Sequence, residues 1–245
     1  MVITPWRPVC ATTLLCAALS SGAPAHAQGY YINPNMYTSM YAVNAAQLAQ
    51  NLQFAARMKE LRSIQASLGA ASRGGKAAAD ALPAGSGANA PAAPFSVTDF
   101  TPTGRRDAPQ RLAAQLKDPA ARQQIVKMAR EILAAIEQQP TFRRNNLAYA
   151  LAVLLGGSLQ VLSGQEFDDA RSEALARWIN NEMAATGAVA RLDAAQRTQL
   201  YDALLLQGGL IIGIAQAAVE NNDAEQVKTA KTMARDALAT FGIRL

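Results

Sequence analysis

Apolar side chains recur at intervals of three and four residues through the C-terminal part of the chain, a spacing that places them on one face of an α-helix. Ile125, Ala129, Ile132 and Ile136 show this spacing clearly. The same analysis predicts five helices, at residues 118–139, 145–162, 167–185, 193–220 and 223–241.

Local signals mark the ends of these helices. Asp118 precedes Pro119, which is typical of an N-cap followed by proline at the first helical position. Asp193 and Asp223 each stand three residues before a glutamine, the pattern of a capping box. Gly187 is placed to end the helix over residues 167–185.

The segment 145–162 is apolar on nearly all sides, which predicts the central, most buried helix. Glycine pairs interrupt this helix at residues 156–157 and the helix over 193–220 at residues 208–209. Because an interior glycine costs about 0.5–1 kcal/mol relative to alanine, we expect the two helices to cross closely at the glycines. No segment alternates in the manner of a strand, so the predicted fold is an all-α compact bundle of five or six helices.

The chain before residue 95 divides into three further parts. A hydrophobic run from Val9 to Leu19 follows Arg7, and Ala25-His26-Ala27 resembles a small-x-small cleavage site. This predicts a signal peptide over residues 1–27, with cleavage between Ala27 and Gln28 and a periplasmic or secreted product.

Residues 28–69 hold a Tyr/Asn-rich start and a predicted amphipathic N-terminal helix at 40–68. Residues 70–94 are dominated by Ala, Gly and Pro and have almost no large apolar side chains to bury, which predicts a flexible linker. The helical domain then occupies residues 95–245, and the N-terminal helix is tethered to it. No transmembrane span is predicted in the mature chain, because its apolar stretches are too short.

The positions of cysteine and histidine restrict the possible functions more than any other feature of the composition. Both cysteines and the single histidine lie within the predicted signal peptide, as Cys10, Cys16 and His26. A mature chain without them has no disulfide, no Cys/His zinc site and no histidine-dependent triad. We therefore expect no metal and no cofactor, and the composition favours a non-enzymatic role.

Carboxylates gather at one place, as Glu166, Asp168, Asp169 and Glu173. Two of them could serve as acid and base of a histidine-independent glycan hydrolase. The alternative interpretation is local: acids in the first turn of a helix complement its dipole, and Glu173 forms an ion pair with Arg177. The local interpretation is favoured, because catalysis also needs a cleft and a raised pKa.

Charge is distributed unevenly along the mature chain, with a net +7 up to Gln165 and a net −3 from Glu166 onward. Two arginine pairs, Arg105-Arg106 and Arg143-Arg144, are candidate anion-binding residues. Because cations are disfavoured at a helix N-terminus, the second pair is expected to meet an anion. That anion is either a carboxylate from the acidic half or an external phosphate or carboxylate group.

Residues 98–106, Thr-Asp-Phe-Thr-Pro-Thr-Gly-Arg-Arg, lead into the helices, and Leu147-Ala148-Tyr149-Ala150 and a Val-Leu-Ser-Gly ending at residues 161–164 follow. These features resemble a family of exported bacterial helical domains of unknown function, over residues 95–245. The resemblance implies an all-α exported domain and carries no catalytic residues. Independently of it, Phe95 and Phe100 are placed to anchor an extended strap across the helices.

The combined prediction is a non-catalytic, exported protein-interaction or cell-envelope-associated module. Its expected partner is another envelope protein or a second copy of the chain, bound through the N-terminal helix, and nucleic acid is not expected. Two alternatives stay open: the carboxylate-only glycan hydrolase, and a binder of anionic membrane surface or lipopolysaccharide through the basic half.

Overall fold

The computed structural model describes residues 92–104, 106–114 and 116–243. Within these residues the chain forms six α-helices and no strand, which confirms the predicted all-α bundle. The predicted signal peptide, the N-terminal helix and most of the predicted linker lie outside the described residues.

The helices follow one another in a simple order. They are α4 (Ala108–Ala113), α5 (Pro119–Glu137), α6 (Leu147–Ser163), α7 (Asp169–Thr186), α8 (Ala194–Glu220) and α9 (Ala224–Thr240). Two short 3-10 turns, η3 (Phe95–Val97) and η4 (Val189–Arg191), precede α4 and α8. The sequence prediction missed α4, because six residues are too few to establish a helical period.

The predicted helix boundaries are confirmed by their caps. The Asp118 side chain accepts hydrogen bonds from the backbone of the first turn of α5. Asp193 and Gln196 form a complete capping box at the start of α8, and Asp223 caps α9. Gly187 ends α7 in the left-handed conformation, with a φ of 61°, which glycine adopts without a steric penalty.

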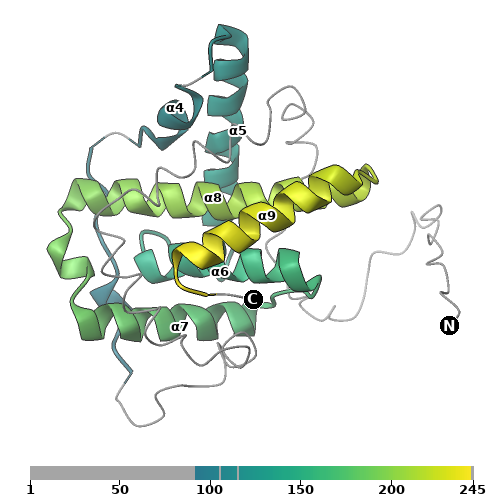
Figure 1. Ribbon diagram of the computed structural model, residues 1–245. Coiled ribbons are helices and arrows are strands. Elements are labelled where there is room, and N and C mark those ends of the chain that lie inside the picture. The colour runs from purple at the N-terminus through teal and green to yellow at the C-terminus, as the bar shows by residue number, and fades with distance from the viewer. Residues whose placement is uncertain (1–91, 105, 115, 244–245) are drawn as a thin grey trace, which may run out of the picture.

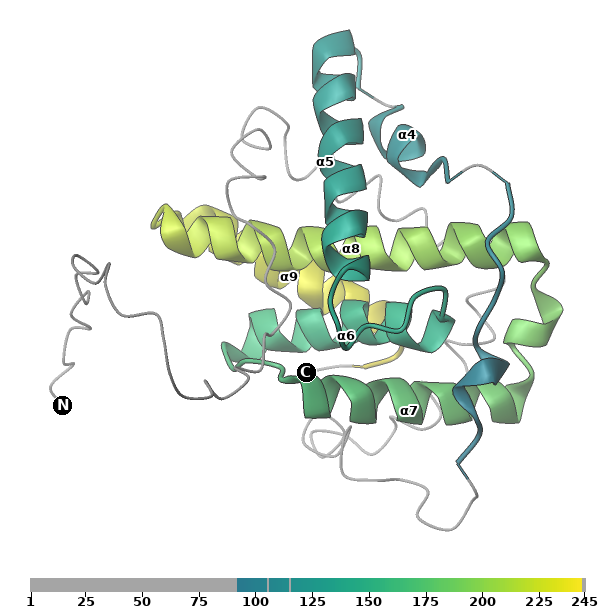
Figure 2. The same cartoon turned by 180° about the vertical axis from the view of Figure 1, so that it is seen from behind.

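Helices α6, α7 and α8 lie side by side, with α6 in the middle (Figures 1 and 2). Helix α9 crosses one face of this layer and packs on both α6 and α8, whereas α5 meets α8 on the opposite face. The hairpin of α4 and α5 projects away from the layer (Figure 2). Because α6 is covered on several sides, every residue from Leu147 to Ser158 except Tyr149 is buried, which confirms the prediction of a central helix.

Glycines set the closest approach between α6 and α8. A Cβ atom at Gly208 would lie 3.0 Å from the backbone Cα and N of Leu154, and one at Gly157 would lie 2.6 Å from Cδ1 of Ile212. The predicted close crossing is therefore confirmed at these two positions. Gly156 instead leaves room for the ring of Phe167, 2.9 Å from where its Cβ would stand.

Helix α8 is the one helix of the described chain that is long and apolar enough to cross a membrane. In its most apolar window, 78% of the residues are buried inside the bundle. A core helix has this character, because its apolar surface already packs against other helices.

Candidate functional site

A strap of extended chain, residues 92–104, connects the first described residue to α4 and crosses three helices on its way (Figure 2). It contacts α7 through Ala93, the start of α6 through Thr98 and Asp99, and α8 through Thr103, whose backbone N–H donates to Thr198. Ala93 belongs to the predicted linker, so the strap contacts the helical domain slightly before its predicted start at residue 95.

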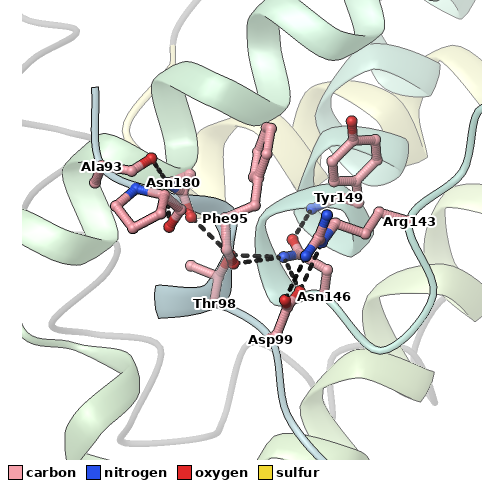
Figure 3. A network of polar contacts seen from close by, with 9 residues as sticks. Ala93, Phe95, Thr98, Asp99, Arg143, Asn146, Tyr149 and Asn180 are labelled. Carbon is pink, nitrogen blue, oxygen red and sulfur yellow. Dashed lines mark hydrogen bonds and ion pairs between the residues drawn. The ribbon is translucent and has the colours of Figure 1, made fainter. Parts of the chain in front are cut away.

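Three fully buried polar side chains, Thr98, Asn146 and Asn180, hold the strap in place (Figure 3). The Thr98 hydroxyl donates to Oδ1 of Asn180 over 2.7 Å and accepts from Nδ2 of Asn146 over 2.9 Å. Nδ2 of Asn180 also donates to the carbonyl oxygen of Ala93 over 2.9 Å. Buried amides and hydroxyls are costly unless they are paired, so this arrangement selects one position for the strap.

Asn146 joins the strap to α6 in two further ways. Its Oδ1 accepts from the backbone of Tyr149 as the N-cap of α6, and its Nδ2 donates to Oδ1 of Asp99 over 2.7 Å. On the backbone, the Leu147 N–H donates to the Thr98 carbonyl, and residues 99 and 146 form an isolated antiparallel bridge. Side-chain and backbone hydrogen bonds therefore join the strap directly to the start of α6.

Aromatic contacts reinforce this attachment on both sides. The ring centroid of Phe95 lies 5.2 Å from that of Tyr149 on α6, and that of Phe100 lies 5.3 Å from that of Tyr201 on α8. The expectation that Phe95 and Phe100 anchor a strap is confirmed.

Arg106 lies just beyond the strap and reaches a buried acid of the acidic half. Its Nε donates to Oδ1 of Asp202 over 2.9 Å, and its guanidinium also pairs with Glu137 at 2.8 Å. Asp202 is 1% exposed. Burial acts to lower the pKa of Arg106, but the hydrogen bonds that its guanidinium donates to Asp202 and Glu137 outweigh this effect and raise that pKa.

The two arginines of the second pair, Arg143 and Arg144, bind different partners in the structure. Arg143 forms a bidentate ion pair with Asp99, in which Nε donates to Oδ1 over 2.8 Å and Nη2 donates to Oδ2 over 2.6 Å. Arg144 instead donates to the backbone carbonyl oxygen of Glu137. Arg106 and Arg144 thus meet at Glu137, whereas Arg143 faces the strap. Arg105 lies outside the described residues. Binding of an external anion by these arginines stays a prediction.

The bond from Arg143 lowers the pKa of the Asp99 carboxyl, the largest single influence on it, although partial burial works in the opposite direction. The same pair raises the pKa of Arg143. Asp99 therefore stays ionised to more acidic pH in the folded protein than in the unfolded chain.

The acidic cluster occupies the start of α7, as its local interpretation predicts. Asp168 is the N-cap and accepts from the backbone of Arg171, and Glu173 pairs with Arg177 at 2.7 Å. Asp169 and Glu173 also line a small surface hollow beside Tyr149. Glu166 is exposed and does not line this hollow.

No group of three or more potential metal ligands of the His, Cys, Asp and Glu types occurs in the part of the chain that the structure describes.

Sequence reasoning missed the two buried polar residues that matter most to the strap region, Asn180 and Asp202. Each had a visible signal, a polar side chain on a helical face that is otherwise apolar. Asn180 stands four residues after Ala176 and three before Met183, both buried. The sequence does not reveal the partners of these two residues. Asn180 pairs with Thr98 and Asp202 pairs with Arg106, and both partners are far away in the chain.

The family model described as "Family of unknown function (DUF6683)" matches residues 7–245. This range extends well before residues 95–245, over which the sequence resemblance was drawn. No curated protein matches the chain, and no solved structure matches it.

Proposed function

Since the chain belongs to DUF6683, a family of unknown function, we propose a role from its own residues. The protein is an exported, non-catalytic interaction module with an N-terminal segment, residues 28–91. The helical domain binds the residues that directly follow this segment, around Ala93, and so fixes the point from which the segment extends. The N-terminal segment then contacts an envelope protein or a second copy of the chain.

The attachment of the strap is the observation that carries this proposal. A linker that merely joins two parts needs no buried polar contacts, yet Ala93 is bonded through its N–H to Asn181 and through its carbonyl to Asn180. Fully paired buried polar groups favour one arrangement over its competitors. The segment before residue 92 therefore starts from a defined point beside α7, which suits presentation of a binding element.

Export is the first half of the proposal, and its test is direct. The full chain with a C-terminal tag is expressed in a Gram-negative host, and the protein recovered from the periplasm is analysed by mass spectrometry. We expect an N-terminus at Gln28. Full-length chain confined to the cytoplasm would refute export.

Interaction is the second half, and it is tested on the apolar face of the predicted helix at 40–68. Full chains carrying Leu48→Asp with Leu52→Asp, two leucines four residues apart and therefore on one face of a helix, are compared with wild type as bait for envelope extract. A matched control carries Gln47→Asp with Gln50→Asp, which adds the same charge among the polar positions of the same segment. We expect wild type and control to retain a protein, or a second copy of the chain, that the leucine variant loses. Identical retained proteins for all three would refute this role of the segment.

A further inference from the structure

The hairpin of α4 and α5 carries a concentrated positive charge. From Arg111 to Arg130 the sequence holds five cations and a single acid, Asp118. Both carboxylate oxygens of Asp118 accept hydrogen bonds from the first turn of α5, which they cap. The hairpin projects from the bundle, with the start of α5 farthest from α8 (Figure 2). Its cations therefore extend beyond the other helices.

Three of these cations lie on one side of the hairpin. Arg122 and Arg130 are two steps of four residues apart on α5, which places them on one side of the helix and about 12 Å apart along its axis. Lys117 lies next to them, since Nη2 of Arg122 donates to the Lys117 carbonyl oxygen over 3.1 Å. Val126 is half-buried and stands between the two arginines. We call Lys117, Arg122 and Arg130 the basic stripe.

The charges of the basic stripe are not compensated within the described chain. Arg122 donates to a carbonyl oxygen, and Arg130 lies within hydrogen-bond distance of the Gln110 side-chain amide on α4, so both partners are neutral. None of the three cations forms an ion pair with a carboxylate of the described residues. All three residues are exposed. Their charges are therefore available to an external anion.

The other end of the bundle has the opposite charge. From Glu166 to Thr186, the stretch that contains α7, the sequence holds five acids and two arginines. The hairpin packs on α8, α8 packs on α6, and α6 packs on α7, so two helices separate the basic end from the acidic end (Figures 1 and 2). A molecule with this charge distribution turns its basic end toward an anionic surface and its acidic end away from it.

We propose that the basic stripe docks on a bilayer surface that contains anionic phospholipids. A row of exposed cations along one side of a projecting helix contacts several lipid phosphates at once, and each such cation strengthens binding about fivefold. Val126 adds an apolar side chain among the cations, as in helices that lie at a membrane interface. The docking surface belongs to the helical domain and does not depend on the N-terminal segment.

Sedimentation with vesicles tests the docking, with the mature chain recovered after export. Vesicles of phosphatidylglycerol mixed with phosphatidylcholine should retain the protein, and vesicles of phosphatidylcholine alone should retain far less. Retention by the anionic vesicles should fall when the ionic strength is raised from about 0.01 M to about 0.1 M, because the Debye length falls from about 30 Å to about 10 Å.

Two double variants that change the net charge equally locate the docking surface. Arg122→Gln with Arg130→Gln should weaken binding to the anionic vesicles about 25-fold, the product of two fivefold losses. Lys228→Gln with Arg235→Gln is the control, because it removes two exposed cations from α9, which packs on the opposite face of the layer from α5. The control should weaken binding by less than about twofold. Circular dichroism and urea unfolding check that both variants stay folded.

Three results would overturn the proposal: equal retention by the two kinds of vesicle, unchanged binding by the Arg122 and Arg130 variant, or an equal loss in the α9 control. Other occupants of the stripe would give different results. Saturable binding of inorganic phosphate without retention by vesicles would identify a free phosphate ligand. A dimer that the hairpin variant abolishes, again without retention by vesicles, would identify a second copy of the chain. Either result would overturn docking on lipid.

Discussion

At the scale of single residues, Asn146 and Asn180 hold the strap because each side chain has both a donor and an acceptor. Asn180 accepts from Thr98 and donates to the backbone of residues 93 and 94. A paired buried amide adds little net stability, but removing it leaves its partners unpaired. The energetic role of these residues therefore appears when they are replaced.

Asn180→Ala should lower the free energy of unfolding by about 1–3 kcal/mol, because the Ala93 carbonyl loses its donor and the Thr98 hydroxyl loses an acceptor. Urea unfolding followed by circular dichroism measures the change. Asn181→Ala is the matched control, since that side chain is only partly buried and makes one bond to the strap. An equal loss in both variants would contradict the special role of the buried network.

The pair of Asp99 and Arg143 makes stability depend on pH in acid. Because the folded pKa of Asp99 lies below its ordinary value of 3.8, the unfolded chain binds more protons across that interval. The pair's contribution is present above pH 3.8 and is lost as the pH falls through the lower folded pKa. Urea titrations between pH 2 and 6 should show a shallower acid loss in Asp99→Asn, and an unchanged slope would refute the assignment.

At the scale of elements, the crossing of α6 and α8 depends on the absence of side chains at Gly157 and Gly208. The local cost of glycine in a helix is offset where the backbones approach, since the neighbouring side chains then pack without voids. The two positions differ in what they face: Gly157 meets the end of Ile212, whereas Gly208 meets the backbone of α6 itself.

Gly208→Ala should therefore lower the free energy of unfolding by about 1–3 kcal/mol, the cost of overpacking a core. The loss is expected although alanine is the better helix former. Gly156→Ala is the comparison, because its Cβ would meet only the ring of Phe167, which can shift. Thermal unfolding of the two variants ranks them, and a Gly208→Ala protein as stable as wild type would refute a tight crossing.

At the scale of the whole molecule, the chain combines a helical bundle with a long N-terminal part whose structure stays a prediction. The described bundle begins its contacts at Ala93, close to the predicted domain start at residue 95. Of the predicted linker over residues 70–94, only residues 92–94 are among the described residues.

Limited proteolysis tests this division. Trypsin should cut first after Arg73 and Lys76, within the predicted linker, and leave a product that contains all of α4 to α9. Mass spectrometry of the early products identifies the sites. First cuts inside α5 to α9 would contradict the predicted domain organisation.

Most of the helices could be predicted because their signals are local. Asp118 with Pro119, Asp193 with Gln196, and Gly187 act within a few residues, so their effect is visible in the sequence. The apolar character of residues 145–162 on nearly all sides likewise identified α6 as the central helix. The sequence missed α4 because its six residues are too few to establish a helical period, and its packing against α5 and α8 is visible only in the structure.

The sequence by itself determined the helical class, the caps, the absence of cysteine and histidine after residue 26, and the glycines available for a close crossing. Only the tertiary structure decided which carboxylate faces which arginine, and that Thr98 meets Asn180 82 positions away. It also placed Tyr149 and Ser172 around one hollow with Asp169. The reason is physical: caps and periods act over one or two turns, whereas a buried polar group is satisfied by whichever partner the packing brings to it.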